Sequence, residues 1–180
     1  MHPIKVVITG GPGTGKTSVI NLLRKRYPVE PESARLVLTR NKLFKHHSAV
    51  EVSGIKLQEA IWNLEVKHYK QALKSKSRIV FFDRGYFDGF AYAHLSHLHK
   101  LHKEKEAGKL INYNYIFMLN PLPIKFYGND NIRAESYQQS KKIHKLIIST
   151  YKKFGYKPIN VPFDTVKNRA EFILNHIKER

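Results

Sequence analysis

Gly10-Gly11-Pro12-Gly13-Thr14-Gly15-Lys16-Thr17 is the most informative segment of this sequence. The run Ile4-Lys5-Val6-Val7-Ile8-Thr9 directly before it is short and rich in β-branched residues, which predicts a buried strand. Residues 18–26, directly after it, place apolar side chains at helical spacing. A Gly-x-x-x-x-Gly-Lys-Thr pattern between a strand and a helix is typical of a phosphate-binding loop, the P-loop.

The chemistry of this loop follows from its residue types. Its glycines let the main chain curl with the N–H groups inward, at the positive end of the following helix. We expect Lys16 to reach the β- and γ-phosphates of a nucleoside triphosphate and Thr17 to offer its hydroxyl to Mg²⁺. The residues expected to contact the nucleotide are Gly11, Pro12, Gly13, Thr14, Gly15, Lys16, Thr17 and Ser18.

Further strands and helices alternate along the rest of the chain. This order predicts a three-layer α/β/α sandwich, in which right-handed crossovers produce a parallel sheet with helices on both faces. The predicted strands are 4–9, 29–32, 78–83, 113–119 and 157–161, and the predicted helices are 18–26, 33–38, 56–74, 86–105, 134–154 and 166–178. The segment 40–54 is polar and predicted to be irregular.

A carboxylate follows the strand predicted at 78–83. Asp83 ends this apolar run, where an acid can hold Mg²⁺ directly or through water, and Arg84 next to it can bind a substrate anion or offset developing negative charge. Asp83 could also cap the helix predicted to begin near Tyr86, a role compatible with metal binding. Ligands of parallel sheets bind beyond the carboxyl ends of the strands, so we expect Asp83 to lie beside the loop at residues 10–17.

The remaining candidate for chemistry is an acid near the second strand. A hydroxyl that accepts a phosphoryl group needs a positioned base within hydrogen-bond reach. Glu32 is the leading candidate and Glu30 competes with it. Either could instead be a solvated acid, because carboxylates are favoured at the first turn of a helix.

The chain resembles the AAA-domain family of P-loop ATPases that is related to the ribosylnicotinamide kinases. The residues that carry the resemblance are Gly10–Thr17, Glu32-Ser33-Ala34-Arg35 and Phe82-Asp83-Arg84-Gly85-Tyr86-Phe87-Asp88-Gly89-x-Ala91-Tyr92. This resemblance implies a five-stranded parallel sheet in the order 2-3-1-4-5 with a lid over the nucleotide. It also implies that Glu32 acts as base, that Asp83 and Arg84 serve metal and phosphate, and that Arg133, in a lid at about 121–140, approaches the triphosphate.

Composition limits the remaining possibilities. The 180 residues suffice for a single domain, 1–180, and 32 Lys and Arg against 14 Asp and Glu give a formal net charge of +18. This charge attracts polyanions, so a nucleic-acid partner is possible, although surface lysines that solvate helix faces would give the same excess. The chain has no cysteine and no apolar stretch long enough for a membrane span. We expect a cytoplasmic protein.

Three functions are compatible with these observations. The leading hypothesis is an ATP- and Mg²⁺-dependent phosphotransferase that acts on a small hydroxyl-bearing acceptor, most simply a nucleoside or nucleotide. The second is a regulatory ATPase with water as the acceptor, and the third is a nucleic-acid end kinase whose binding falls steeply with salt. A GTPase is disfavoured, because Leu119-Asn120-Pro121 stands where a guanine-reading Asn/Thr-Lys-x-Asp sequence would occur.

Overall fold

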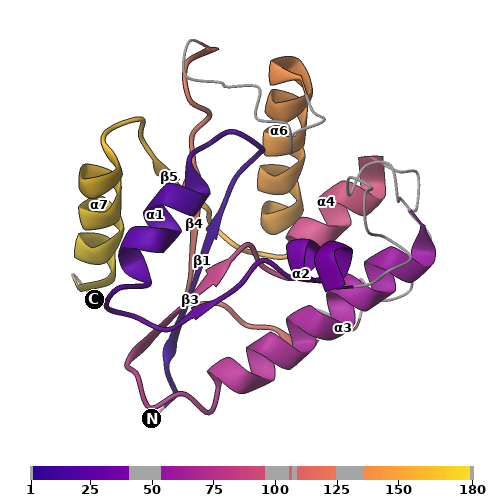
Figure 1. Cartoon of the computed structure of the whole chain (residues 1–180), viewed down its shortest axis with the longest axis horizontal. Coiled ribbons are helices and arrows are strands. Elements are labelled where there is room, and N and C mark those ends of the chain that lie inside the picture. The colour runs from indigo at the N-terminus through magenta and orange to yellow at the C-terminus, as the bar shows by residue number, and fades with distance from the viewer. Residues whose placement is uncertain (1, 41–53, 96–105, 107–108, 125–135, 179–180) are drawn as a thin grey trace.

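In the part of the chain that the structure describes, five strands are connected by helices (Figure 1). The structure, a computed structural model, describes residues 2–40, 54–95, 106, 109–124 and 136–178. The strands are β1 (Ile4–Thr9), β2 (Val29–Glu30), β3 (Ile79–Asp83), β4 (Tyr115–Leu119) and β5 (Ile159–Val161). The helices are α1 (Lys16–Leu23), α2 (Ser33–Arg40), α3 (Ile55–Ala72), α4 (Asp88–Leu95), α6 (Tyr137–Lys153) and α7 (Val166–Lys178).

The strands form one parallel sheet in the order β2-β3-β1-β4-β5, which confirms the predicted topology. The central strand β1 is buried because it has helices on both faces, and its residues Val6, Val7 and Ile8 are fully inaccessible to solvent. In the register of the sheet, Ile8 pairs with Asp83 of β3 and Thr9 pairs with Met118 of β4. The carboxyl ends of β1, β3 and β4 therefore lie together, at the edge where ligands of such sheets bind.

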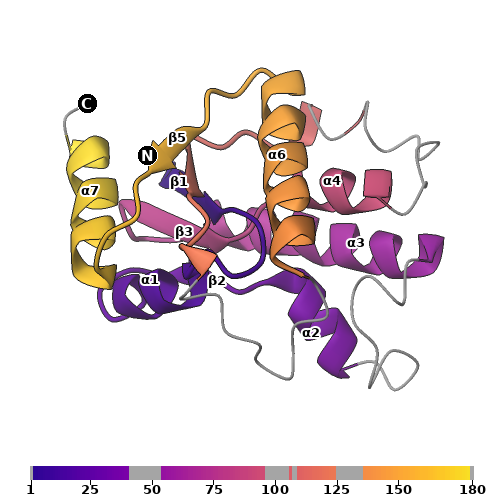
Figure 2. The same cartoon turned by 90° about the horizontal axis from the view of Figure 1, so that it is seen from above.

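Helices cover both faces of the sheet, as Figures 1 and 2 show. Helices α1 and α7 pack on one face over a core that includes Ile20, Phe81 and Ile173. Helices α3, α4 and α6 pack on the other, where aromatic rings fill most of the core. Its larger members are Trp62, Tyr69, Phe82, Tyr86, Phe87, Phe90, Tyr113 and Tyr151. The molecule is therefore the three-layer sandwich that the alternation of elements predicts.

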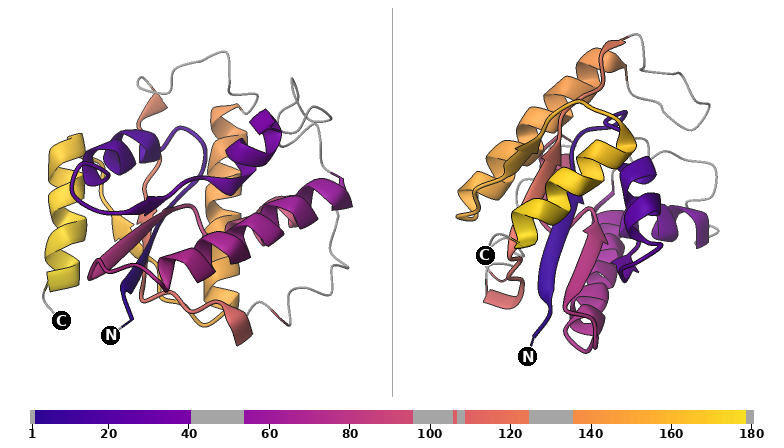
Figure 3. Two further views of the ribbon diagram at one scale, coloured as in Figure 1. Left: turned by 60° about the horizontal axis from the view of Figure 1, so that its bottom comes forward. Right: turned by 90° about the vertical axis from the view of Figure 1, so that its left-hand side faces the viewer.

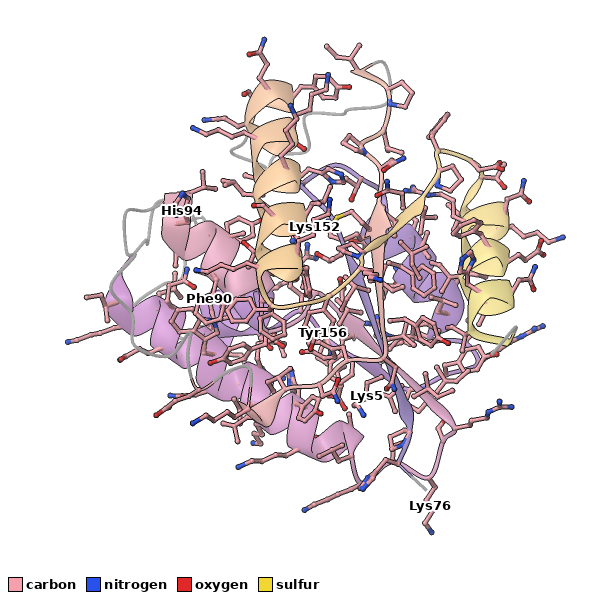
Figure 4. All side chains as sticks on the ribbon, turned by 180° about the vertical axis from the view of Figure 1, so that it is seen from behind. Lys5, Lys76, Phe90, His94, Lys152 and Tyr156 are labelled. Carbon is pink, nitrogen blue, oxygen red and sulfur yellow. The ribbon has the colours of Figure 1, made fainter. Side chains whose placement is uncertain are left out.

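The aromatic core places α4 firmly against its neighbours. Phe87 and Phe90 lie with their ring centroids 4.5 and 5.4 Å from that of Phe154, which follows α6. Figure 4 shows Phe90 directed inward between the helices, whereas His94 lies at the outer end of α4. Because α4 begins five residues after Asp83, this packing fixes the segment that leads from β3 to the helix.

Most predicted boundaries lie within two residues of the observed ones. Helix α7 occupies the predicted residues, whereas α1 begins at Lys16, two residues earlier than predicted, because Gly15 turns the chain directly into the helix. The irregular segment predicted at 40–54 and the second half of the helix predicted at 86–105 fall largely outside the described residues. Among the described helices, none combines the length and apolar character that crossing a membrane requires.

Candidate functional site

The loop between β1 and α1 depends on glycine at two positions. Gly10 has φ +142°, and a Cβ atom there would lie 2.7 Å from the carbonyl oxygen of Leu119 on the neighbouring strand. Gly15 has φ +78°, in the left-handed region that side chains disfavour, and it immediately precedes the first residue of α1. The loop is thus a tight turn into a helix N-terminus, the shape that binds phosphate groups through main-chain N–H groups.

Lys16 lies inside this loop. Its Nζ donates to the carbonyl oxygens of Gly10 and Gly11, both at 2.8 Å, and to Thr14 Oγ1 at 3.2 Å. Burial lowers the pKa of Lys16 to about 7, with the positive charge of Arg84 as a second cause. The ammonium group therefore sits at the centre of the loop, where a polyphosphate would restore its preference for the charged form.

Helix α6 supports the loop from the side, as the view in Figure 2 shows. Ser140 donates from its hydroxyl to the carbonyl of Pro12, and His144 Nδ1 accepts the N–H of Gly11 at 3.4 Å. Burial and then the charge of Lys16 lower the pKa of His144 to about 4, so the ring is neutral and able to accept this bond. Sequence reasoning missed both residues, because no local pattern connects them to a loop more than 120 positions away.

Asp83 ends β3 beside the loop, as predicted from its place in the sequence. Burial, followed by the charge of Glu32, raises the pKa of Asp83, and its carboxylate makes no hydrogen bond within the described residues. Thr17 lies in the first turn of α1 and is exposed. A carboxylate and a hydroxyl are the hard oxygen ligands that Mg²⁺ prefers, and nearby positive charge would stabilise ionised Asp83. The two residues thus fit a magnesium ion held mainly by water and phosphate oxygens.

The described residues contain no cluster of three or more His, Cys, Asp or Glu side chains that could hold a metal ion. Magnesium keeps several waters and takes only one or two protein carboxylates when it accompanies a nucleotide.

Arg84 connects the acidic groups of the site to the loop. Its Nε donates to Glu32 Oε1 at 2.8 Å, while its Nη1 donates to the carbonyl of Gly10 and to Asp88 Oδ1, both at 3.2 Å. Its main chain has φ +70°, and its N–H donates to the carbonyl of Ile8 at 3.0 Å. A left-handed conformation of a residue other than glycine is unfavourable, and it persists here because several groups hold the side chain and the main chain.

The surrounding charges determine the ionisation of the pair formed by Arg84 and Glu32. Burial acts to lower the pKa of Arg84, but Tyr92, Glu32 and further acids outweigh it and raise that pKa well above its ordinary value. Burial likewise acts to raise the pKa of Glu32, and the charges of Arg84 and Lys16 outweigh it, so that the net shift is downward. Both groups are therefore charged at neutral pH.

The two competing acids near β2 differ in their surroundings. Glu32 contacts Arg84 and lies close enough to Lys16 for the two charges to interact. Glu30 lies in β2 itself, makes no ion pair within the described residues, and has a pKa raised by burial. The geometry therefore favours Glu32 as the acid that faces the loop.

Asp88, which belongs to the motif at residues 82–92, organises the centre of the site. It is 3% exposed, and its Oδ1 accepts from Thr9 Oγ1 and Arg84, while its Oδ2 accepts from the Gly85 N–H at 3.1 Å and the Tyr151 hydroxyl at 2.7 Å. These donors come from the ends of β1 and β3 and from α6. Asp88 therefore fixes Arg84 in position and is itself fully hydrogen-bonded.

A second buried polar group holds the start of α2, next to Glu32. Ser33 Oγ lies 3.0 Å from His68 Nδ1 of α3, and the Ser33 hydroxyl also interacts with the carboxyl group of Glu65. Burial raises the pKa of Glu65 to about 8, so this carboxyl group is protonated at neutral pH. The left view in Figure 3 shows α2 lying across α3, the arrangement that these contacts hold. Arg133 and most of the lid predicted at 121–140 lie outside the described residues.

A parallel sheet in the order 2-3-1-4-5, with a glycine loop around a buried lysine after its central strand, defines a P-loop NTPase of the kinase-like type. The sequence model of the AAA domain matches residues 5–169, and the chain belongs to this family. No curated protein matches the chain in sequence.

Solved structures with the same fold include two of the NadR protein. The complex with NR superposes with a TM-score of 0.77 at 17% identity, and the complex with NAD and AMP-PNP with a TM-score of 0.71 at 18% identity. Each alignment covers 99% of this chain, but only 50% and 49% of the respective NadR chain, so this chain spans about half the length of NadR. Deoxyadenosine kinase from M. mycoides with bound dATP superposes with a TM-score of 0.67 at 17% identity, over 97% of this chain and 100% of the kinase.

Proposed function

We propose that this protein is an ATP- and Mg²⁺-dependent phosphotransferase that acts on a hydroxyl group of a small acceptor, a nucleoside or nucleotide. One observation carries the proposal. Arg84 joins the carboxylate of Glu32, at 2.8 Å, to the carbonyl of Gly10 in the loop, at 3.2 Å. The side chain of Arg84 thereby connects a carboxylate that could bind an acceptor hydroxyl to the loop that would hold the phosphates.

In the proposed mechanism, the main-chain N–H groups of residues 13–16 and the ammonium of Lys16 bind the β- and γ-phosphates. Thr17 and Asp83 would hold Mg²⁺, which, when bound, supplies charge neutralisation for the phosphate oxygens. Arg84, charged and fixed by Asp88, lies where it can offset negative charge on the transferred group.

Glu32 would accept a hydrogen bond from the acceptor hydroxyl and so orient it toward the γ-phosphate. Its lowered pKa makes it a weak base, which suits phosphoryl transfer because the transition state is loose and little proton abstraction is needed before it. Positioning is then the main contribution of this side chain. On closure of a lid at about 121–140, Arg133 would add a second guanidinium group.

The class of acceptor is supported by the proteins that share the fold. NadR has been crystallised with NR, NAD and AMP-PNP, and the M. mycoides protein is a deoxyadenosine kinase. Each of these names denotes a nucleoside, a nucleotide or an enzyme that acts on one. Hydrolysis with water as acceptor and phosphorylation of nucleic-acid ends are supported by no contact in the described site.

The test is to incubate the protein with γ-labelled ATP, Mg²⁺ and separate panels of nucleosides, nucleotides and oligonucleotides, and to identify the species that gains phosphate. We expect a nucleoside or nucleotide to be labelled. Glu32→Gln should reduce transfer by at least about tenfold while ATP binding is kept, because it removes the charge that orients the hydroxyl. Glu30→Gln, two residues away and outside the ion pair, is the matched control and should keep transfer.

Release of phosphate at the same rate with and without any acceptor would contradict the proposal in favour of a hydrolase. Labelling of oligonucleotides alone, with a steep dependence on salt, would contradict it in favour of an end kinase.

A further inference from the structure

Arg169 of α7 is a buried arginine with no acidic partner among the residues that the structure describes. It is 3% exposed, and no carboxylate of the described residues forms an ion pair with it. Burial lowers the pKa of Arg169 and the charge of Asp164 acts to raise it, but the Oδ1 atom of Asp164 accepts from Thr165 N and Asn168 Nδ2 at the start of α7. Burying an unpaired charge is costly, so the groups that Arg169 does contact need an explanation.

Those groups are two main-chain carbonyls, one in the phosphate-binding loop and one just after β4. Nη1 of Arg169 donates to the carbonyl of Thr14 at 2.8 Å, and Nη2 donates to the carbonyl of Asn120, just after β4, at 3.4 Å. Its Nε is buried without a hydrogen-bond partner in the described part of the chain. The charged guanidinium of Arg169 thus donates hydrogen bonds to the loop and to the chain just after β4.

The peptide group between Thr14 and Gly15 explains what this contact can do. In a planar trans peptide the carbonyl and the following N–H point in opposite directions. Since Arg169 holds the carbonyl of Thr14 from outside the loop, the N–H of Gly15 points away from Arg169. That N–H makes no hydrogen bond within the described residues, and it belongs to the turn that precedes α1.

The packing at Gly15 leaves little freedom for this arrangement. A Cβ atom at Gly15 would lie 3.1 Å from Nη1 of Arg169 and 3.9 Å from a methyl group of Leu122. The guanidinium therefore lies directly against the main chain of the loop. A cationic donor on a carbonyl also polarises the peptide group and makes its N–H a stronger donor.

We propose that Arg169 is a positioning residue for phosphate binding, which orients and polarises the Thr14–Gly15 peptide so that the Gly15 N–H faces a bound phosphate. The inference rests on the proposed function, because it assumes that the loop binds a polyphosphate. Helix α7 is remote from the loop in sequence. Through Arg169 it would contribute to the affinity for phosphate without direct contact between Arg169 and the ligand.

The experiment compares wild type with Arg169→Met, which keeps much of the apolar stem and removes the charge, and with Arg169→Gln. Lys167→Met is the matched control, because this lysine lies two residues earlier on α7 with its side chain 79% exposed. Affinities for Mg²⁺ with ATP, and for Mg²⁺ with tripolyphosphate, are measured by calorimetry at a temperature where circular dichroism shows every variant to be folded.

We expect both Arg169 variants to bind ATP and tripolyphosphate more weakly by the same factor, about tenfold, as for the loss of one charge-assisted hydrogen bond. Lys167→Met should stay within about twofold of wild type, in line with the small effects of most exposed charges. The amide proton of Gly15 should also move upfield in the NMR spectrum of Arg169→Gln without ligand, because its peptide group is no longer polarised.

A loss of affinity for ATP with unchanged affinity for tripolyphosphate would overturn the inference, because Arg169 would then contact the nucleoside. Unchanged affinity for both ligands would also overturn it. If Arg169→Met does not fold, Arg169→Gln is judged by the same criteria. If wild-type protein binds neither ligand, the proposed function itself is contradicted. If wild type and the Arg169 variants bind both ligands equally well, only the role of Arg169 is contradicted.

Discussion

Asp88 holds Arg84 in the site: Oδ1 of Asp88 accepts from Nη1 of Arg84 at 3.2 Å, and both side chains are largely buried. Arg84 is thereby bound from two sides, by Asp88 and by Glu32. Because Asp88 also accepts from Thr9, Gly85 and Tyr151, the position of Arg84 depends on the ends of two strands and on α6.

Replacing Asp88 by Asn should impair both stability and transfer. The substitution keeps the shape of the side chain but leaves Arg84 with one charged partner, and breaking a buried ion pair costs about 3–5 kcal/mol. We expect a clear decrease in the free energy of unfolding and a decrease in kcat of at least about tenfold, since a displaced cation stabilises the transition state less. Denaturant titration and steady-state kinetics measure the two effects.

Tyr151→Phe is the graded control for this prediction. It removes one neutral donor from Asp88 and should cost about 1 kcal/mol of stability with a smaller change in kcat. Equal kcat values for wild type and Asp88→Asn would contradict the role given to Asp88.

Glu65 should make the stability of the protein depend on pH. Burial raises the pKa of Glu65 from its ordinary value of 4.5 to about 8 in the folded protein. Between these two values the folded protein binds a proton that the unfolded chain lacks, so the contribution of Glu65 to stability is present below about pH 4.5 and is lost as pH rises through about 8.

The measurement is the Tm of wild type and of Glu65→Gln at several pH values across this window. Gln stays neutral, so the Tm of the variant relative to wild type should rise steadily with pH. Glu171→Gln is the control, because Glu171 is exposed on α7 and should show no such trend. A difference between wild type and Glu65→Gln that is independent of pH would contradict the burial of an ionisable carboxyl group at this position.

Gly89 should not tolerate a methyl group, although it lies in a helix. Alanine in place of glycine within a helix is ordinarily favourable by up to about 1 kcal/mol. At Gly89, however, a Cβ atom would lie 2.5 Å from Nε1 of Trp62, a side chain that is 1% exposed and packs against Phe90. Neither ring can move without disturbing the aromatic core.

We therefore expect Gly89→Ala to destabilise the protein by about 1–3 kcal/mol, the usual cost of overpacking, as measured by denaturant titration. Gly54→Ala is the matched control, because Gly54 precedes α3 in an extended conformation with open space around it, and the change there should cost a few tenths of a kcal/mol. A Gly89→Ala variant at least as stable as wild type would show that Trp62 can move.

The fold was predictable from the sequence because its signals are local. β-branched runs and helical spacing located the strands and helices, and the P-loop pattern identified the central strand. The order of the strands came from the resemblance of residues 10–17, 32–35 and 82–92 to a family, since pairing between distant strands leaves no mark on either strand alone. The predicted start of α1 was two residues late, because the left-handed conformation of Gly15 determines where the helix begins.

The candidate site was predictable only where a motif carried it. Lys16 belongs to the P-loop motif after β1, Asp83 and Arg84 lie at the end of β3, and the structure brings them together with Glu32. The groups that hold them were not predictable, because His144 and Arg169 reach the loop through tertiary packing from helices that carry no motif. The site assignments themselves stay predictions until ligands are bound.

Calorimetric titration of wild type and Lys16→Ala with ATP in the presence of Mg²⁺ shows whether residues 10–17 bind a polyphosphate. Lys16 is the cation at the centre of the loop, so wild type should bind and the variant should bind at least about tenfold more weakly while remaining folded. Wild-type protein with no affinity for any nucleoside triphosphate in the presence of Mg²⁺, or a variant that binds as tightly as wild type, would contradict the claim that residues 10–17 bind a polyphosphate.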